Sequence, residues 1–375
     1  MIYLSPLDAL LNLVSPNPSG LESLTTDWEA LVDTAERHAL VPLLHARLEP
    51  ILDRLPPAVQ ESLQRAYTDS AAHTIFFEFA LESIIEAFRR EQIPLVAYKG
   101  IPLARMLYDD SAVRLAGDID VMVPTADLER CQVLLEQEGW QHERTWEIHL
   151  NYVKKMGGTE IPLEVHWVSQ REGEYHIPHM RFWEEAFETE AGWTFSREMT
   201  LLIIVLHCAR HFFVPYRQMV DIAHAVAQWN ETLDWERIVA LANEAHATPM
   251  LATVLALAHR DLGAPLPKHA TLVQLMASWR IRMTIRYLSV DHLLGEPLFS
   301  ALDRYFVPLL NGAWHPARLI LHDFLPPPEL VVYRYDVSPN SRWIPLYTIL
   351  RPLRLLGKHL RQRFSYKSTE QKLKN

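Results

Sequence analysis

The spacing of apolar positions along the chain changes twice, and the changes separate a helical, a mixed and a second helical region. In residues 58–92 apolar side chains recur three and four positions apart, which predicts a long helix. Its predicted apolar stripe consists of Phe76, Phe79, Ala80, Ile84, Ala87 and Phe88. Shorter helices are predicted at 28–38, where Asp27 is suited to cap the first turn, and at 42–48.

The pattern from residue 93 to residue 168 is typical of short strands joined by turns and helices. Strands are predicted at 93–98, 117–123, 143–155 and 161–168. Helices are predicted at 101–107 and at 126–138, the second capped by Thr125. The sequence Gly157-Gly158-Thr159 predicts a hairpin turn between the last two strands.

From residue 197 onward the helical spacing returns, with helices predicted at 198–213, 216–229, 235–245, 247–262 and 271–294. We therefore predict an α+β fold, in which a small mixed-sheet core is flanked by N-terminal and C-terminal helical regions. The expected organisation is an N-terminal helical region at 1–92, an α/β core at 93–196, a helical domain at 197–300 and a C-terminal extension at 301–375.

Composition restricts the classes of function. The chain has 375 residues, 49% of them hydrophobic, and a net charge of −10, which argues against non-specific binding of nucleic acid. The tail from Arg351 to Asn375 is locally basic, with Glu370 as its one acid. Two interpretations of this tail stay open, a solvated segment and a contact for anionic lipid or nucleic acid.

Two further counts bear on compartment and topology. The only cysteines, Cys131 and Cys208, are too few for a disulfide framework or a four-cysteine zinc site, and they favour the reducing cytoplasm. There is no apolar run of about 18 residues, so we expect no membrane span.

Two carboxylates lie two residues apart in the strand predicted at 117–123. Because side chains alternate between strand faces, Asp118 and Asp120 share one face, while Ile119 and Val121 point into the core. Two like charges on one face of an apolar strand are unfavourable unless a cation lies between them. Mg²⁺ commonly combines one or two protein carboxylates with substrate phosphates. We predict a divalent-cation site here, with two solvated acids at a strand end as the alternative.

The strand predicted at 161–168 repeats this alternation. Glu164 and His166 share one face, and Leu163 and Val165 share the other. If the two strands are neighbours, Glu164 supplies a third carboxylate, and three such groups repel one another unless cations neutralise them. For His166 two interpretations stay open, a contact to substrate or metal ligands and a hydrogen-bonded buried histidine.

Basic residues around these strands are candidates for phosphate binding. Lys99-Gly100 ends the strand at 93–98 and opens the next helix, where backbone N–H groups bind anions. No packing role is predicted for Lys99. Arg114 lies four residues before Asp118 and is expected to reach the same phosphates, with a structural pairing to Asp109 or Asp110 as the competing interpretation.

Three polar residues of the second helical region have less specific patterns. His207 and His211 are four residues apart on one helix face, which is compatible with a packed polar patch, a wall of the active-site cleft or a zinc site. The glutamate of the zinc-protease motif is replaced by Cys208. For Asp221 we expect a surface position or a salt bridge to Arg217, with activation of an acceptor hydroxyl as the alternative.

Residues from about Phe76 to Tyr335 resemble a family of uncharacterised nucleotidyltransferases in the polymerase-β superfamily. The matching segments are Tyr98-Lys99-Gly100-Ile101-Pro102-Leu103, Arg114 with Gly117-Asp118-Ile119-Asp120-Val121, Leu163-Glu164-Val165-His166, Leu206-His207-Cys208-Ala209-Arg210-His211, Val220-Asp221-Ile222-Ala223 and Leu325-Pro326-Pro327-Pro328-Glu329. The wider superfamily has a Gly-Ser pair at the start of its active site, whereas no serine follows Gly100 here.

The resemblance implies a nucleotide-binding transferase that moves a nucleoside monophosphate from an NTP to an unidentified acceptor. Asp118, Asp120 and Glu164 would be catalytic and would bind two Mg²⁺ ions, and Lys99, Gly100, Arg114 and His166 would bind substrate. The alternative is a catalytically degenerate transferase fold that acts as a nucleotide-binding or scaffold protein. A third interpretation is a helical interaction protein in which Asp118 and Asp120 have no role.

Overall fold

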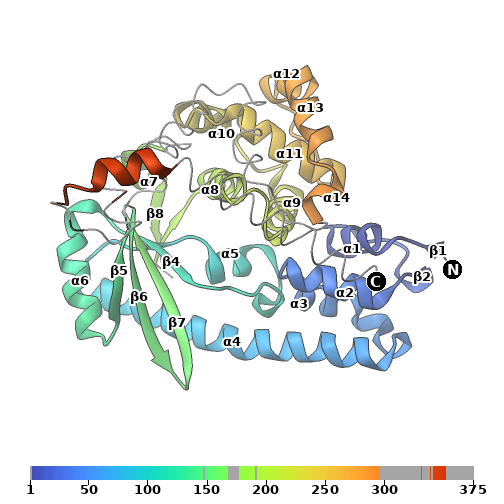
Figure 1. Ribbon diagram of the computed structural model, residues 1–375, viewed down its shortest axis with the longest axis horizontal. Helices are drawn as coiled ribbons and strands as arrows, with labels where there is room; N and C mark the ends of the chain where they lie inside the picture. The colour runs from blue at the N-terminus through green and yellow to red at the C-terminus, as the bar shows by residue number, and fades with distance from the viewer. Residues whose placement is uncertain are drawn as a thin grey trace. The chain divides into compact units, whose positions relative to one another are not determined.

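The computed structural model describes residues 2–146, 148–167, 177–190, 192–294, 331, 338 and 341–351. The chain divides into two compact units, Met1–Leu298 and Phe299–Asn375. The first unit is an α+β fold in which one seven-stranded mixed sheet is combined with many helices (Figure 1). In the second unit residues 344–351 are helical. No helix among the described residues is long and apolar enough to cross a membrane.

The N-terminal region is helical, as predicted. It contains α1 (Pro6–Val14), α2 (Trp28–Arg37), α3 (Val41–Leu48) and the long α4 (Pro57–Arg90), with a small parallel pair formed by β1 (Ile2–Tyr3) and β2 (Leu24–Thr25). The Asp27 side chain accepts a hydrogen bond from the Ala30 backbone N–H, so the predicted cap of α2 is confirmed.

The sheet has the strand order β5-β6-β7-β4-β3-β9-β8. Its strands are β3 (Val96–Ala97), β4 (Ile119–Met122), β5 (Gln141–Thr145), β6 (His149–Met156), β7 (Thr159–His166), β8 (Ala186–Thr189) and β9 (Gly192–Phe195). The central pair β4–β7 is parallel, whereas β6–β7 and β3–β4 are antiparallel. The helices α5 (Gly100–Leu107), α6 (Leu128–Gln137) and α7 (His179–Glu184) lie between the strands in sequence.

One predicted strand proved to be two strands, and one pair of strands was not predicted. The continuous strand predicted at 143–155 is two antiparallel strands, β5 and β6, joined by a turn that the Trp146 N–H closes onto the His149 carbonyl. This segment contains neither glycine nor proline, so nothing local marked the turn. The pair β8–β9, two strands of four residues each, was not predicted.

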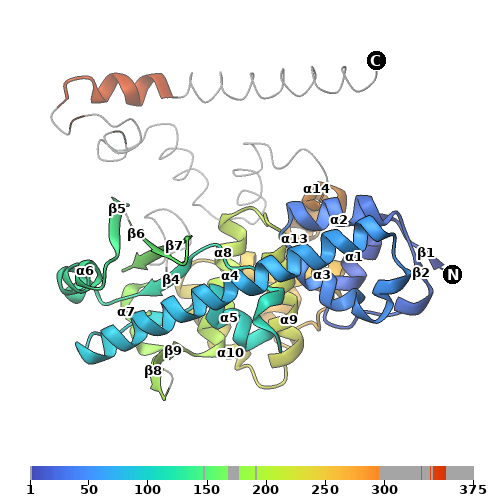
Figure 2. The same ribbon diagram turned by 90° about the horizontal axis from the view of Figure 1, so that it is seen from below.

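One face of the sheet packs against α4 and α6 and forms the core of this region. Its buried side chains include Phe77, Leu81, Ile84 and Phe88 of α4, Ile119, Val121 and Val123 of the β4 segment, and Leu163 and Val165 of β7. Burying each of the larger side chains contributes about 1.5–3 kcal/mol. In both views α4 runs along this face of the sheet (Figures 1 and 2).

The predicted apolar stripe of α4 needs one correction. Phe79 is 60% exposed, and Phe77 and Leu81 take the buried positions instead. Phe76 lies over the β6–β7 turn, where a Cβ added at Gly157 would come within 2.6 Å of the Phe76 ring. Gly157 also has φ of +56°, so close packing and backbone conformation both require glycine at this turn.

The second helical region contains α8 (Arg197–Arg210), α9 (Arg217–Trp229), α10 (Trp235–Glu244) and α11 (Thr248–Leu262). The single helix predicted at 271–294 is three short helices, α12 (Ala270–Ala277), α13 (Trp279–Tyr287) and α14 (Val290–Leu294). Ser278 ends α12 and caps α13 through a hydrogen bond from Ile281 N–H, which explains the break between these two. The predicted cap of α6 was wrong. Thr125 begins a short 3₁₀ segment before that helix and does not cap it.

Candidate active site

Three carboxylates meet on the face of the sheet that does not contact α4. Asp120 of β4 and Glu164 of β7 are register partners on neighbouring parallel strands, and Asp118 immediately precedes β4. Each of the three offers an oxygen, and these oxygens lie within 4.8 Å of one another. Since alternation sends Ile119 and Val121 into the core, the strand pairing alone brings the polar side chains together.

Asp120 is the most enclosed member, with only 4% of the residue exposed. Its Oδ1 atom lies 2.8 Å from Lys99 Nζ and 3.1 Å from His166 Nε2. Lys99 itself is only 12% exposed. The expectation that Lys99 has no structural role is therefore wrong, because it neutralises a buried carboxylate.

The pKa values of the carboxylates diverge because their surroundings differ. Burial, together with the neighbouring Asp120 carboxylate, raises the pKa of Asp118 to about 6. Burial opposes ionisation of Asp120 too, but Lys99 and His166 outweigh it and hold the pKa of Asp120 well below its ordinary value. For Glu164, burial is outweighed by the hydrogen bond from His166, and the pKa is lowered. The cluster thus holds more negative charge than Lys99 balances.

Gly100 brings the start of α5 against the carboxylate strand. Its φ is +54°, and a Cβ at this position would lie 3.1 Å from the Asp118 carbonyl oxygen. Any other residue would be strained in conformation and crowded against the strand. The glycine therefore lets the helix N-terminus approach the carboxylates closely.

Arg114 has a different position from the one predicted. Its Nε and Nη2 atoms donate to Asp221 Oδ2 at 3.0 and 2.9 Å, and its Nη1 donates to the Gly100 carbonyl at 3.0 Å. The arginine and aspartate side chains are 7% and 2% exposed. In this conformation the guanidinium is not free to turn towards phosphates. Its structural partner is Asp221 rather than Asp109 or Asp110, the two aspartates of the competing interpretation.

The expectations for Asp221 also need correction. It is 1% exposed, so it is not a surface acid, and its partners are Arg114 and the Tyr108 hydroxyl rather than Arg217. Arg217 instead donates to the Leu115 carbonyl. Burial, with the nearby Arg114 charge, lowers the pKa of Arg217 to about 10. The polar cluster links α9 to the loop before β4.

A cavity lies between the carboxylates and the helices α8 and α9. Its lining residues come from four segments: Lys99, Gly100 and Leu103; Arg114, Ala116, Gly117, Asp118 and Asp120; Ile204 and His207; and Arg217, Gln218 and Asp221. A second cavity on the other side of Lys99 is lined by Tyr98, Lys99, His166, Ile177, Ile203, Leu206, His207 and Arg210. The site is therefore bounded by the sheet on one side and by helices on the other.

His207 of α8 lines both cavities. Its ring lies 4.4 Å from that of His211, centroid to centroid. Burial, with the Lys99 charge, holds the pKa of His207 well below its ordinary value. For His211, burial together with Arg210 lowers the pKa to about 4.

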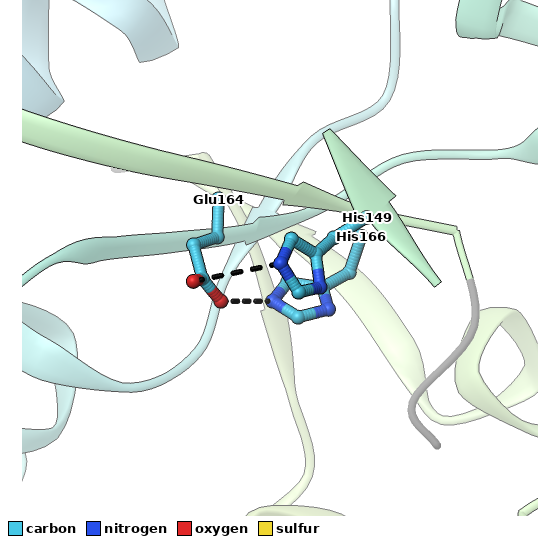
Figure 3. A group of neighbouring side chains, drawn as sticks. All are labelled: His149, Glu164 and His166. Carbon is cyan, nitrogen blue, oxygen red and sulfur yellow. Dashed lines mark ion pairs between the residues drawn. The ribbon is translucent and has the colours of Figure 1, made fainter. Parts of the chain in front are cut away.

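His149 was not identified from the sequence, although it lies beside the carboxylates. Its Nε2 atom is 3.6 Å from Glu164 Oε1, and its ring centroid is 4.7 Å from that of His166 (Figure 3). Burial and the neighbouring His166 lower the pKa of His149 to about 4. The predicted Gly157-Gly158 turn contained the signal for it. If the turn pairs Met156 with Thr159, the antiparallel register continues back along the hairpin and places His149 opposite His166.

The basic tail lies outside the described residues apart from Arg351, so neither of its interpretations is tested.

Comparisons with known proteins identify the family of the chain. The model of a protein family described as uncharacterised nucleotidyltransferase matches residues 25–263. No curated protein matches the chain. A solved structure, the crystal structure of ANT(2")-Ia in complex with adenylyl-2"-tobramycin, is 14% identical and covers 45% of this chain and 95% of its own, with a TM-score of 0.32. So loose an overlap carries no functional inference.

Proposed function

Because the chain belongs to the family of uncharacterised nucleotidyltransferases, we propose that it transfers a nucleoside monophosphate group from an NTP to an acceptor with the help of Mg²⁺. The observation that carries this proposal is the meeting of three carboxylates from β4 and β7 beside a cavity that also contains Lys99 and Gly100. Phosphoryl chemistry of this type depends on positioning and on charge stabilisation rather than on a protein nucleophile.

The carboxylate set is suited to Mg²⁺. All three ligands are oxygen donors, and their oxygens lie within 4.8 Å of one another. Asp118, Asp120 and Glu164 would hold the ions, and two ions fit the proposed chemistry. Bound Mg²⁺ would supply charge stabilisation at the α-phosphate and at the leaving pyrophosphate.

The remaining residues would orient the nucleotide. Lys99 Nζ, which here neutralises Asp120, would turn to the phosphates once that carboxylate has a cation partner. The backbone N–H groups at the start of α5, admitted by Gly100, would bind phosphate oxygens. His166 would hold the Asp120 and Glu164 carboxylates in place through its Nε2 atom.

Arg114 would act indirectly. All three of its side-chain nitrogen atoms have partners, and one of them donates a hydrogen bond to the Gly100 carbonyl. We therefore assign it the role of positioning the Lys99-Gly100 segment rather than of binding phosphate directly. Glu164, whose pKa is lowered, would be ionised near neutral pH and would help activate the acceptor oxygen.

A matched pair of variants on β7 tests the proposal. Glu160 is exposed and pairs with Lys155, whereas Glu164 lies in the carboxylate cluster four residues further along the same strand. Calorimetry with Mg²⁺ and a non-hydrolysable NTP should show lost binding in Asp118→Asn/Asp120→Asn and weakened binding in Glu164→Gln, but wild-type binding in Glu160→Gln. Equal binding in all four proteins would remove the carboxylates from the function.

Turnover is measured separately as Mg²⁺-dependent pyrophosphate release from each NTP in the presence of cell extract, with α-labelled nucleotide used to identify the acceptor. The Lys99–Asp120 ion pair and the missing serine after Gly100 favour a second candidate, a nucleotide-binding protein without catalysis. Mg²⁺-dependent NTP binding without pyrophosphate release or a labelled acceptor would establish that candidate instead.

A further inference from the structure

A second group of potential metal ligands adjoins the three carboxylates and has a different chemistry. His149, Glu164 and His166 each offer one ligand atom, and these atoms lie within 4.8 Å of one another. Figure 3 shows both imidazole rings directed at the Glu164 carboxylate from the same side. Imidazole nitrogen is a ligand that transition metals prefer and Mg²⁺ does not.

The sheet itself fixes this arrangement. His149 and His166 are register partners across the antiparallel strands β6 and β7, and Glu164 lies two residues before His166 on the same face. Directly opposed residues on neighbouring strands have Cβ atoms about 4.5–5.5 Å apart. All three ligands are therefore supplied by two paired strands and need no loop to close on them.

Glu164 presents a different carboxylate oxygen to each imidazole. Its Oε2 lies 3.2 Å from His166 Nε2, and its Oε1 lies 3.6 Å from His149 Nε2. In a tetrahedral site with bonds of about 2.0–2.1 Å, neighbouring ligand atoms are about 3.3–3.4 Å apart. Each imidazole nitrogen is therefore already near the distance from the carboxylate that a shared metal ion would require.

Hydrogen bonding alone does not satisfy these groups. His166 Nε2 carries at most one proton, yet it faces Asp120 Oδ1 at 3.1 Å and Glu164 Oε2 at 3.2 Å. Glu164 remains 25% exposed, whereas the His149 and His166 side chains are 9% and 4% exposed. The open side is thus next to the carboxylate, where a fourth ligand such as water has access.

We propose that His149, Glu164 and His166 form a cation site that binds a divalent transition metal of the Zn²⁺ class, distinct in chemistry from the Mg²⁺ site of the carboxylates. Two imidazoles and one carboxylate with an open fourth position are a ligand set found at catalytic zinc centres. The site does not depend on nucleotidyl transfer. It shares Glu164 with the carboxylate cluster, and a metal bound at His166 Nε2 would take the place of the proton that this nitrogen directs at Asp120 and Glu164.

Titration of the nucleotide-free full chain with Co²⁺, a spectroscopic substitute for Zn²⁺, tests this site. The wild type should bind one Co²⁺ with the intense visible absorption of a tetrahedral complex, and Zn²⁺ should displace it. His149→Gln should weaken binding at least tenfold, the scale of effect seen even for residues around metal ligands. Far-UV circular dichroism of each variant confirms that it is folded.

Two control variants make the result specific. His142→Gln changes an exposed histidine on the adjacent strand β5, and Glu160→Gln changes an exposed glutamate of β7 outside both ligand groups. Both should bind Co²⁺ within about twofold of the wild type. Co²⁺ binding at wild-type strength in His149→Gln would overturn the proposal.

The histidine pair on α8 is the competing location, so His211→Gln completes the set. Loss of the Co²⁺ spectrum in His211→Gln with retention in His149→Gln would assign the metal to α8 and refute the site. Anomalous scattering from Zn²⁺-loaded wild-type crystals gives a result independent of any variant. A peak between His149 and His166 supports the proposal, and a peak only at Asp118 contradicts it. Because neither measurement involves nucleotide or turnover, its outcome is separate from that of the proposed transferase function.

Discussion

Replacing Arg114 by alanine should be among the most destabilising single changes near the site. The substitution leaves Asp221 almost fully buried, with the Tyr108 hydroxyl as its remaining hydrogen-bond partner among those described above. Removing one member of a buried ion pair costs about 3–5 kcal/mol, because the other charge remains desolvated without compensation. The lost hydrogen bond to the Gly100 carbonyl adds to this cost.

The magnitude can be measured against an exposed ion pair in the same protein. Arg65 and Glu61 are 65% and 74% exposed on α4, so Arg65→Ala should cost at most about 1 kcal/mol. Urea unfolding followed by tryptophan fluorescence gives the free energy of unfolding for the wild type and both variants. We expect the difference between the two variants to be at least about 2 kcal/mol, which follows from the two ranges.

A third protein distinguishes the loss of a charge pair from the loss of packing. In Arg114→Met/Asp221→Leu both charges are removed together, and apolar side chains fill much of the space. Such replacements of buried ion pairs are often neutral or stabilising, so the double variant should be more stable than Arg114→Ala. If Arg114→Ala is no less stable than Arg65→Ala, the inferred structural role of the buried pair is wrong.

Three further predictions follow from the same region and from the helical core. Gly100→Ala should lower the free energy of unfolding more than Gly263→Ala, because both glycines have positive φ but only Gly100 lies against a backbone carbonyl. Thermal melting of the two variants measures the difference in stability, which we expect to be about 1–3 kcal/mol. Lys99→Met should weaken NTP binding by about 1.5–3 kcal/mol in calorimetry, and an unchanged affinity would exclude a phosphate contact. His38, whose Nδ1 accepts a backbone N–H, has its pKa lowered chiefly by burial. The unfolded state therefore binds the proton more tightly, and stability should decline as pH falls below about 6.5. In urea unfolding at pH 7 and pH 5, His38→Gln should lose less stability on acidification than the wild type, and equal losses would contradict this.

Much of the carboxylate site followed from local sequence. Strand alternation was sufficient to place Asp118 with Asp120 and Glu164 with His166 on common faces, because successive side chains in a strand point to opposite sides whatever the strand pairs with. Most helices were predicted too, and α2 has the cap predicted from Asp27, although the helix predicted at 271–294 proved to be three and Thr125 does not cap α6. These features depend on neighbours within a few residues, which the sequence displays directly.

Other features depended on register and on contacts between distant segments. His149 lies at the site only because β6 pairs with β7. The single strand predicted at 143–155 did not include the turn between β5 and β6 that precedes His149. Lys99 is ion-paired because β3 lies antiparallel to β4, and this pairing brings the C-terminal end of β3 beside Asp120. Strand order is a property of the assembled sheet, and no spacing along the chain determines it.

The sequence by itself therefore determined which chemical groups the protein has and which of them share a strand face. Only the tertiary structure decided what charge each group meets. Arg114 and Asp221 are 107 residues apart, and they pair because α9 packs beside the loop before β4. An isolated guanidinium near an Asp-x-Asp strand indicates phosphate binding, whereas the same guanidinium buried against a carboxylate has a structural role, since a buried charge requires a partner.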